Sequence, residues 1–388
     1  MNEWEEYKIS DIADVIGGGT PSTSNSSYWN GNIPWLTPRD LTGYSKIYIS
    51  KGERNITSDG LRNSAAKLLP KGTVLLTSRA PIGYVAIAKN EISTNQGFKS
   101  LILKEDYANS EFVYYWIRSN IDYLQSIGTG TTFAEISGSV VKEISISLPS
   151  ISLQKSIASI LSSLDDKIDL LHRQNVTLEK MAETLFRQWF VEEAKEEWVR
   201  TKIGDVLDTV LGGTPSTKKP EYWDGNIPWI NSGEVNNFRI LQCSRFITEL
   251  GLKKSNTKLL PVGTTVLAIT GATLGQVSLL EIDTCANQSV VGIIPNGTLP
   301  KEFIFLWIKM KISEIILSET GGAQPHINKN DINETDIVIP DSDYLNKIKL
   351  TIEPLFKKIT HNSFQIRTLT ALRDTLLPKL MSGEVRVD

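Results

Sequence analysis

The sequence predicts a mixed, β-rich α/β protein in which a globular domain followed by a long helix occurs twice. Much of the chain is written twice, and a segment with a heptad pattern of apolar residues follows each copy. Within each copy, short β-branched runs bounded by Gly, Pro and Asn indicate strands. We therefore expect globular domains at residues 1–150 and 192–341, and helical segments at residues 151–191 and 342–388.

Composition limits the classes of function. The 388 residues are 40% hydrophobic and 22% charged, which is typical of a protein with more than one domain. No apolar run has the length of a membrane span, and the start "MNEWEEYKIS" lacks the features of a signal peptide, so we expect a cytoplasmic protein without membrane contact. A formal net charge of −3 gives no overall basic field, so nucleic acid would need local basic patches or a partner's help. The two cysteines, Cys243 and Cys285, lack CxxC spacing and argue against a disulfide framework or a zinc site.

The repeat covers nearly the whole chain. "GGTPSTSNSSYWNGNIPW" at residues 18–35 is answered by "GGTPSTKKPEYWDGNIPW" at residues 212–229. Further on, "LPKGTVLLTS" and "STNQGF" in the first copy correspond to "LPVGTTVLAI" and "CANQSV" in the second, which aligns Gln96 with Gln288. Each copy is therefore expected to form one globular domain of ordinary size.

Local patterns predict the elements of the first copy. The runs "TVLLTS", "YVAIAK", "KSLIL" and "EISISLP" indicate strands, and residues 110–127 indicate a helix with Ser110 as its N-cap. The stretch "GGGTPST" lacks the Gly-Lys-Ser/Thr end of a phosphate-binding loop, so we expect a turn that leads into a helix, with Thr20 as N-cap and Pro21 at the first helical position. The aromatic residues of "YWNGNIPW" are expected to form local core rather than to stack on bases.

Heptads predict a coiled coil between the two long helices. Apolar residues at alternating spacings of four and three form one seam on each helix. An antiparallel pairing would place Asn175 opposite Asn362, keep most other layers apolar and relate the two domains by a pseudo-two-fold axis; Leu164 would face Arg373, whose head could reach Asp165 or Asp169. Pro354 is expected to kink or restart the second helix. The seam positions are Ile157, Leu161, Leu164, Ile168, Leu171, Asn175, Leu178 and Leu185 in the first helix, and Ile348, Ile352, Leu355, Ile359, Asn362, Ile366, Leu369 and Leu376 in the second.

This order of segments resembles the specificity (S) subunits of Type I restriction-modification systems. The resemblance is carried by both "GGTPS…YW…IPW" openings, the "LP.GT" and "NQ" stretches, and the paired helices that end in "LLPKLMSGEV". It implies two target recognition domains that each read one half of a bipartite double-stranded DNA target, with a fixed non-specific spacer between the halves. It also implies that the helices dock two methyltransferase (M) subunits that methylate adenine, and possibly two restriction (R) subunits. Catalysis, S-adenosylmethionine, Mg and ATP would belong to those partners, so this chain is expected to be non-catalytic, without cofactor or metal.

The candidate DNA contacts follow each "IPW", where the copies diverge as "LTPRDLTG" and "INSGEVNN". Arg39 could contact guanine and Asn231 adenine, each contributing about 1–3 kcal/mol of discrimination, while Lys253 and Lys254 could hold phosphates, as could other clustered basic residues, Arg54 and Arg245 among them. For any one of them, a solvated loop residue is the competing interpretation. The selected positions are Thr37, Arg39, Asp40, Lys46, Arg79, Asn231, Ser232, Glu234, Asn236, Arg239, Lys253, Lys254, Thr270 and Thr273.

Two other functions stay open at this point. A coiled-coil scaffold that binds no DNA would show the same repeat and the same heptads. A fused methyltransferase or endonuclease has less support, because the chain lacks an Asn/Asp-Pro-Pro-Tyr motif and a glycine fingerprint after a strand. Glu193 and Lys195 match half of a nuclease motif but lie just past the first long helix, and His172, His326 and His361 are too scattered for a ligand set.

Overall fold

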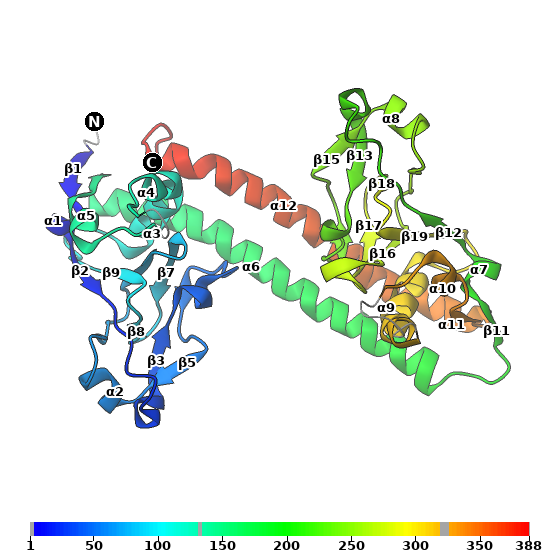
Figure 1. Cartoon of the computed structure of the whole chain (residues 1–388), viewed down its shortest axis with the longest axis horizontal. Coiled ribbons are helices and arrows are strands. Elements are labelled where there is room, and N and C mark those ends of the chain that lie inside the picture. Colours follow the sequence, from blue (N-terminus) through cyan, green and yellow to red (C-terminus); the bar gives the residue numbers. More distant parts are fainter. Residues whose placement is uncertain (1–3, 131–133, 319–325, 388) are drawn as a thin grey trace. The chain divides into compact units, whose positions relative to one another are not determined.

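The computed structural model describes residues 4–130, 134–318 and 326–387 (Figure 1). The ends of the predicted first and last segments, and the parts of the two predicted domains at residues 131–133 and 319–325, lie outside the described residues. Contacts divide the chain into two compact units, Met1–Leu170 with Arg367–Asp388, and Leu171–Ile366. Each unit thus contains one globular domain and a part of both long helices, whereas the sequence analysis set the helices apart as segments of their own.

The first unit is built on a five-stranded sheet in the order β2-β9-β6-β7-β4. A three-stranded sheet, β5-β3-β8, and a pair, β1-β10, complete it, and in Figure 1 the three-stranded sheet with α2 projects from the end of the unit opposite to its helices. All four predicted strands of this copy are present, as β6, β7, β9 and β10. The strands are β1 (Glu5–Lys8), β2 (Ala13–Gly17), β3 (Trp29–Leu36), β4 (Tyr48–Ile49), β5 (Arg54–Ile56), β6 (Val74–Ser78), β7 (Ile82–Ala88), β8 (Ser93–Thr94), β9 (Phe98–Leu103) and β10 (Ser145–Leu148).

The second unit repeats this topology strand for strand. Its five-stranded sheet is β12-β19-β16-β17-β14, its three-stranded sheet is β15-β13-β18, and its pair is β11-β20. The duplicated sequence therefore encodes a duplicated fold. The strands are β11 (Val199–Lys202), β12 (Asp208–Leu211), β13 (Trp223–Ile230), β14 (Arg239–Ile240), β15 (Arg245–Ile247), β16 (Thr265–Ala268), β17 (Val277–Leu280), β18 (Cys285–Ala286), β19 (Val290–Ile294) and β20 (Asp336–Ile339).

Short helices cover the sheets, and two predictions about them were wrong. The segment at residues 110–127 forms two helices, and the first is capped by Asn109, whose side chain accepts from the Phe112 amide. Ser110 instead donates its hydroxyl to the carbonyl of Gly72. Thr20 and Pro21 lie in a loop and start no helix. The short helices are α1 (Ile9–Ile12), α2 (Ser58–Arg62), α3 (Ser110–Ser119), α4 (Ile121–Ser126), α5 (Gly138–Glu143), α7 (Ile203–Val206), α8 (Glu249–Lys253), α9 (Lys301–Ser318), α10 (Lys329–Asn333) and α11 (Ser342–Lys347).

The long helices are α6 (Ile151–Arg187) and α12 (Glu353–Met381). Pro354 stands at the second position of α12, directly after a π-helical turn at Ile348–Ile352, so the predicted restart is confirmed. Both helices also pack on the domains. Phe186 and Phe356, which lie off the predicted seam, are 2% exposed in the core of the second unit.

Within each unit the segments of α6 and α12 run antiparallel. In the second unit Asn362 Nδ2 donates to Asn175 Oδ1 at 2.9 Å, which confirms the predicted polar layer. In the first unit Arg373 Nη1 donates to Asp165 Oδ1 at 2.6 Å, and Tyr115 donates its hydroxyl to the same carboxylate at 2.8 Å. Of the two predicted outlets for the Arg373 head, Asp165 is therefore confirmed. No helix in the described part of the chain is long and apolar enough to cross a membrane.

Candidate nucleic-acid interface

Three loops meet in each unit, and together we call them the loop cluster. In the first unit it comprises residues 18–22, 37–40 and 94–97. The Gly19 amide donates to the Thr94 carbonyl at 2.9 Å, and the Asn95 amide donates to the Leu36 carbonyl at 2.8 Å. A Cβ on Gly18 would lie 2.0 Å from the Asn95 carbonyl oxygen, so only glycine allows this approach.

The second unit has the same cluster, formed by residues 212–216, 231–234 and 286–289. The Gly213 amide donates to the Ala286 carbonyl at 2.7 Å, and the Asn287 amide donates to the Ile230 carbonyl at 3.0 Å. A Cβ on Gly212 would lie 2.2 Å from the Asn287 carbonyl oxygen. The duplicated "GG" and "NQ" motifs therefore build one frame twice.

In each unit two tryptophans donate hydrogen bonds to the backbone of the glycine loop, which is residues 18–22 in the first unit and 212–216 in the second. In the first unit Trp35 Nε1 donates to the Gly19 carbonyl at 2.9 Å and Trp29 Nε1 to the Ser22 carbonyl at 3.1 Å. These indoles are 7% exposed or less and pack edge to face, with 5.1 Å between ring centroids. The prediction of local core is confirmed for them, and buried rings of this kind offer no face to a base.

An arginine covers each tryptophan pair. The guanidinium of Arg54 lies 3.5 Å from the ring centroid of Trp29, and that of Arg245 lies 3.8 Å from the ring centroid of Trp223. Both arginines are exposed. Stacking holds the guanidinium against the indole ring. Its N–H groups point outward past the edge of the ring, so an anion there can accept hydrogen bonds from them.

The turn at which the two copies diverge is capped in the same way in both. Asp40 accepts hydrogen bonds from the amides of Thr37 and Glu53, each at 2.7 Å. Glu234 accepts from the Asn231 amide at 2.9 Å and the Ser244 amide at 2.8 Å. These contacts give both carboxylates a structural role in the turn.

The backbone of the turn is shared, but the residue directly before the capping carboxylate differs between the two units. Arg39 is exposed in the first unit, and Gly233 takes the equivalent place in the second. The side chain of Asn231 is engaged locally, because its Oδ1 accepts from the Gly233 amide and its Nδ2 donates to Glu234. Asn231 would have to leave Glu234 to contact adenine with both amide atoms.

The loop between β6 and β7 adjoins the cluster in the first unit. The Ser78 amide donates to the Gly97 carbonyl at 2.8 Å, and Arg79 follows directly. Arg79 lies 3.4 Å from the carboxylate of Glu135, which also contacts Lys99 Nζ at 3.2 Å. In the second unit the Ile269 amide donates to the Ser289 carbonyl at 2.9 Å, which sets Thr270 and Thr273 in the loop beside that cluster.

The structure does not bring every predicted residue to the loop cluster. Arg239 is only 5% exposed, and its guanidinium pairs with Glu281 at 2.9 Å and contacts Thr360 of α12 at 3.2 Å. Burial lowers the Arg239 pKa to about 10. The expectation that Arg239 faces a phosphate was therefore wrong, because its side chain lies inside the protein.

Four more of the predicted DNA-contacting residues can be placed in the structure: Lys46, Lys253, Lys254 and Asn236. Lys46 lies 3.3 Å from Asp169 of α6, so it links the first domain to the long helix. Lys253 ends α8, and the segment after Lys254 passes within 2.6 Å of where a Gly213 Cβ would stand, which brings it to the glycine loop. Asn236 is exposed after the capped turn and accepts from Asn237.

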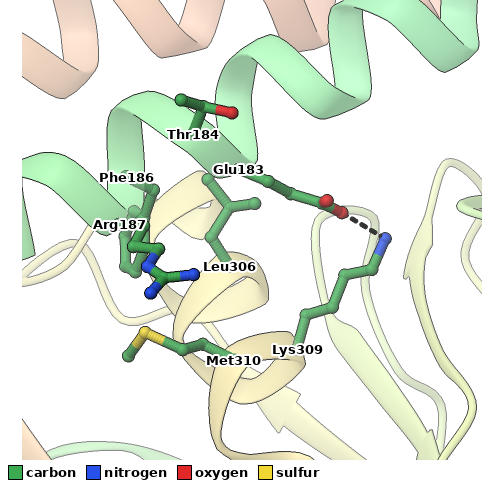
Figure 2. Close-up of a pocket in the computed structure, with 7 residues that line it drawn as sticks. All are labelled: Glu183, Thr184, Phe186, Arg187, Leu306, Lys309 and Met310. Carbon is green, nitrogen blue, oxygen red and sulfur yellow. Dashed lines mark ion pairs between the residues drawn. The ribbon is translucent and has the colours of Figure 1, made fainter. Parts of the chain in front are cut away.

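Figure 2 shows a pocket of the second unit between α6 and α9. Glu183 of α6 and Lys309 of α9 form an ion pair across it at 2.6 Å, and Phe186 and Leu306 line it. None of the predicted DNA-contacting residues line this pocket. Its described lining instead shows how α6 is fixed to the domain. Among the residues that the structure describes, no group of three or more His, Cys, Asp or Glu side chains is placed to hold a metal ion.

Sequence reasoning missed the pairing of Thr20 with Gln96 and of Thr214 with Gln288, which joins the glycine loop to the "NQ" loop in each unit. The signal was present, because both motifs recur together in both copies of the sequence. The local pattern at Thr20 instead predicts the start of a helix, and it indicates no contact with Gln96.

Comparison with known proteins places this fold. Residues 1–180 and 195–369 match the Type I restriction modification DNA specificity domain. The chain is 38% identical over 410 residues to the Type I restriction enzyme MjaIX specificity subunit of Methanocaldococcus jannaschii, covering 100% of this chain and 94% of that protein. It is 23% identical over 471 residues to the HindI specificity subunit of Haemophilus influenzae, covering 99% and 100%.

A solved structure has the same fold. The crystal structure of the Type I restriction-modification S subunit from M. genitalium superposes with a TM-score of 0.64 at 19% identity, over 97% of this chain and 96% of that one. The repeated domains, the antiparallel helix segments and these matches agree. The chain therefore belongs to the specificity subunits of Type I restriction-modification systems, a non-catalytic family whose members hold no cofactor of their own.

Proposed function

We propose that this chain reads a bipartite double-stranded DNA target, one half with each globular domain, in the cytoplasm. The observation that carries the proposal is the loop cluster, because the same backbone frame occurs in both units while the exposed residue of its turn is Arg39 in one and glycine in the other. A common frame with different exposed chemistry is what two readers of different half-sites need. The two half-sites are separated by a spacer of fixed length.

Within this proposal Arg39 reads a base, and Arg54 and Arg245 hold phosphates. Arg39→Ala leaves the Thr37–Asp40 cap in place, so it should relax the preference at one position and cost about 1–3 kcal/mol of binding free energy. Arg54→Met should weaken all sequences alike and reduce the salt slope by about one phosphate contact. If both variants changed binding in the same way, these roles would be wrong.

We further propose that the long helices dock methyltransferase subunits, which methylate adenine in each half-site, and that restriction subunits join this complex. Large apolar side chains on both helices support this, because Leu170, Val176 and Met181 of α6 and Leu372 of α12 are between 39% and 52% exposed. A partner that covered these side chains would remove their apolar surface from water, which favours association.

Domain exchange followed by methylome sequencing tests the proposal. Residues 2–148 are replaced by the first domain of another specificity subunit, and the chain is expressed with its methyltransferase partner. One half-site should change and the other should stay, because each domain has its own core and its own loop cluster. A change in both half-sites, or in neither, would contradict independent reading. A scaffold without DNA contacts would show neither sequence preference nor a salt slope in a gel shift.

A further inference from the structure

The two units present an identical polar pair at the same place. Thr20 Oγ1 donates to Gln96 Oε1 at 2.5 Å, and Thr214 Oγ1 donates to Gln288 Oε1 in the second unit. All four side chains are exposed, and each pair joins the glycine loop to the "NQ" loop of its cluster. The glutamine amide therefore faces solvent beside the turn that differs between the units.

The frame beneath each pair is rigid. The carbonyls of Gly19 and Ser22, on either side of Thr20, are held by the two buried indoles, and Pro21 is buried between them. Trp229 and Trp223 hold the carbonyls of Gly213 and Ser216 in the same way. The threonine that pairs with each glutamine therefore stands on an anchored loop, and the pairing lowers the entropic cost of a contact made by the glutamine.

The pairing uses one of the two lone pairs of each glutamine Oε1 and leaves both N–H groups of Nε2 to other partners. The threonine hydroxyl occupies Oε1, and in the part of the chain that the structure describes no protein atom accepts a hydrogen bond from either Nε2. A phosphate oxygen is an acceptor, so it matches these free N–H groups. A bidentate contact with the adenine edge would require Oε1 to accept a second hydrogen bond beside the one from threonine, whereas a phosphate needs only the N–H groups.

We propose that Gln96 and Gln288, held by Thr20 and Thr214, donate to phosphate oxygens of the DNA backbone and give both domains the same sequence-independent anchor. The proposal rests on the proposed function, because it assumes that the loop clusters face DNA. A group that is identical in both units cannot distinguish two different half-sites, but it can set the register in which the neighbouring turn meets the bases.

Gln96→Glu and Gln288→Glu separate this role from a structural one. Glutamate still accepts from the threonine hydroxyl, so the loop contact is kept, but it has no N–H and repels phosphate. We expect the Kd of the full-length chain, measured together with its methyltransferase partner, for a labelled random-sequence duplex to rise about tenfold per substitution, with an equal rise for the target duplex. Gln188→Glu makes the same charge change on an exposed side chain just past α6, where it gives up a hydrogen bond to Glu193, and should alter Kd by less than about twofold.

Two more variants sharpen the test. Gln96→Lys should recover binding with a steeper salt dependence, because lysine supplies a charged donor to the same phosphate. Thr20→Val should weaken binding uniformly, because the glutamine is no longer held. If wild type binds DNA and the Glu variants bind equally well, or lose affinity for the target alone, this inference is overturned while the proposed function stands. If wild type binds no DNA, both are overturned.

Discussion

Replacing the buried asparagines of the helix pair should reveal strong coupling between them. Asn362 is 0% exposed and Asn175 is 7% exposed, and the Nδ2 of Asn362 donates to the Oδ1 of Asn175 at 2.9 Å. Among the described residues, the Asn362 side chain makes one other hydrogen bond, from Nδ2 to Gln174 Oε1 at 3.4 Å, and its Oδ1 has no partner. Asn175 also donates to Ser363 at 3.2 Å.

The costs of the single substitutions follow from these contacts. Asn175→Leu leaves the amide of Asn362 buried with one long contact, so the free energy of unfolding of the second unit should fall by about 2–3 kcal/mol. Asn362→Leu also removes an unpaired oxygen, and Asn175 keeps Ser363, so it should cost about 1 kcal/mol. The double substitution buries no unpaired amide and should lie within about 1 kcal/mol of wild type or above it.

Native-state hydrogen exchange measures these changes where they occur, because amides in the α6 and α12 segments of the second unit report its local stability. Thr177→Leu, an exposed polar-to-leucine change on α6, is the matched control and should shift stability by less than about 0.5 kcal/mol. Single effects that simply add in the double variant would refute the reasoning, since independent sites show no coupling energy.

Three further predictions concern buried or paired charges. Arg239→Met should destabilise the second unit by about 3 kcal/mol in urea unfolding, because Glu281 loses its buried partner, while the salt slope of DNA binding stays unchanged. Asp165→Ala should destabilise the first unit by about 3 kcal/mol, since Arg118 and Arg373 lose their shared buried carboxylate and Arg373 keeps the more exposed Asp374; a loss below about 1 kcal/mol would contradict this. The hydrogen bond from Lys195 lowers the Asp341 pKa from 3.8 to about 2, so the stability it contributes is present above pH 3.8 and is lost as pH falls toward about 2. Asp341→Asn should therefore make the urea midpoint of unfolding depend less on pH between about 2 and 3.8. A plot of midpoint against pH that matches wild type would contradict this role of Asp341.

Patterns within the sequence predicted much of the fold, because they record local chemistry directly. The repeat predicted two domains of one topology, and the heptads predicted which residues of α6 and α12 would meet at Asn175 and Asn362. Off the seam the prediction failed, because each long helix has a second buried face. Phe186 and Phe356 fill the domain core, and a search for a single stripe does not find them.

Contacts between distant residues explain the errors at the site. Arg239 belongs to a basic cluster in sequence, but its partner Thr360 lies 121 residues away and the strand β14 turns the side chain inward. Thr20 has the pattern of a helix cap, yet it bonds to Gln96, 76 residues away, and the loop stays extended between its anchors. Local propensity could not reveal either outcome, because tertiary contacts decide both.

In the loop cluster, the groups that hold the backbone are separate from the residue that differs between the units, as the proposed reading of two half-sites requires. The turn after β3 and the turn after β13 are each capped by an acidic side chain that bonds the amide of the residue three positions earlier. Because these caps and the glycine contacts involve backbone atoms, the residue between the caps contributes little to the turn and can be arginine or glycine. The side chain at position 39 or 233 can therefore differ without loss of the Thr20–Gln96 or Thr214–Gln288 hydrogen bond. The proposed recognition of bases depends on the exposed side chain of the turn, whereas the stability of the loop cluster depends on hydrogen bonds to backbone atoms.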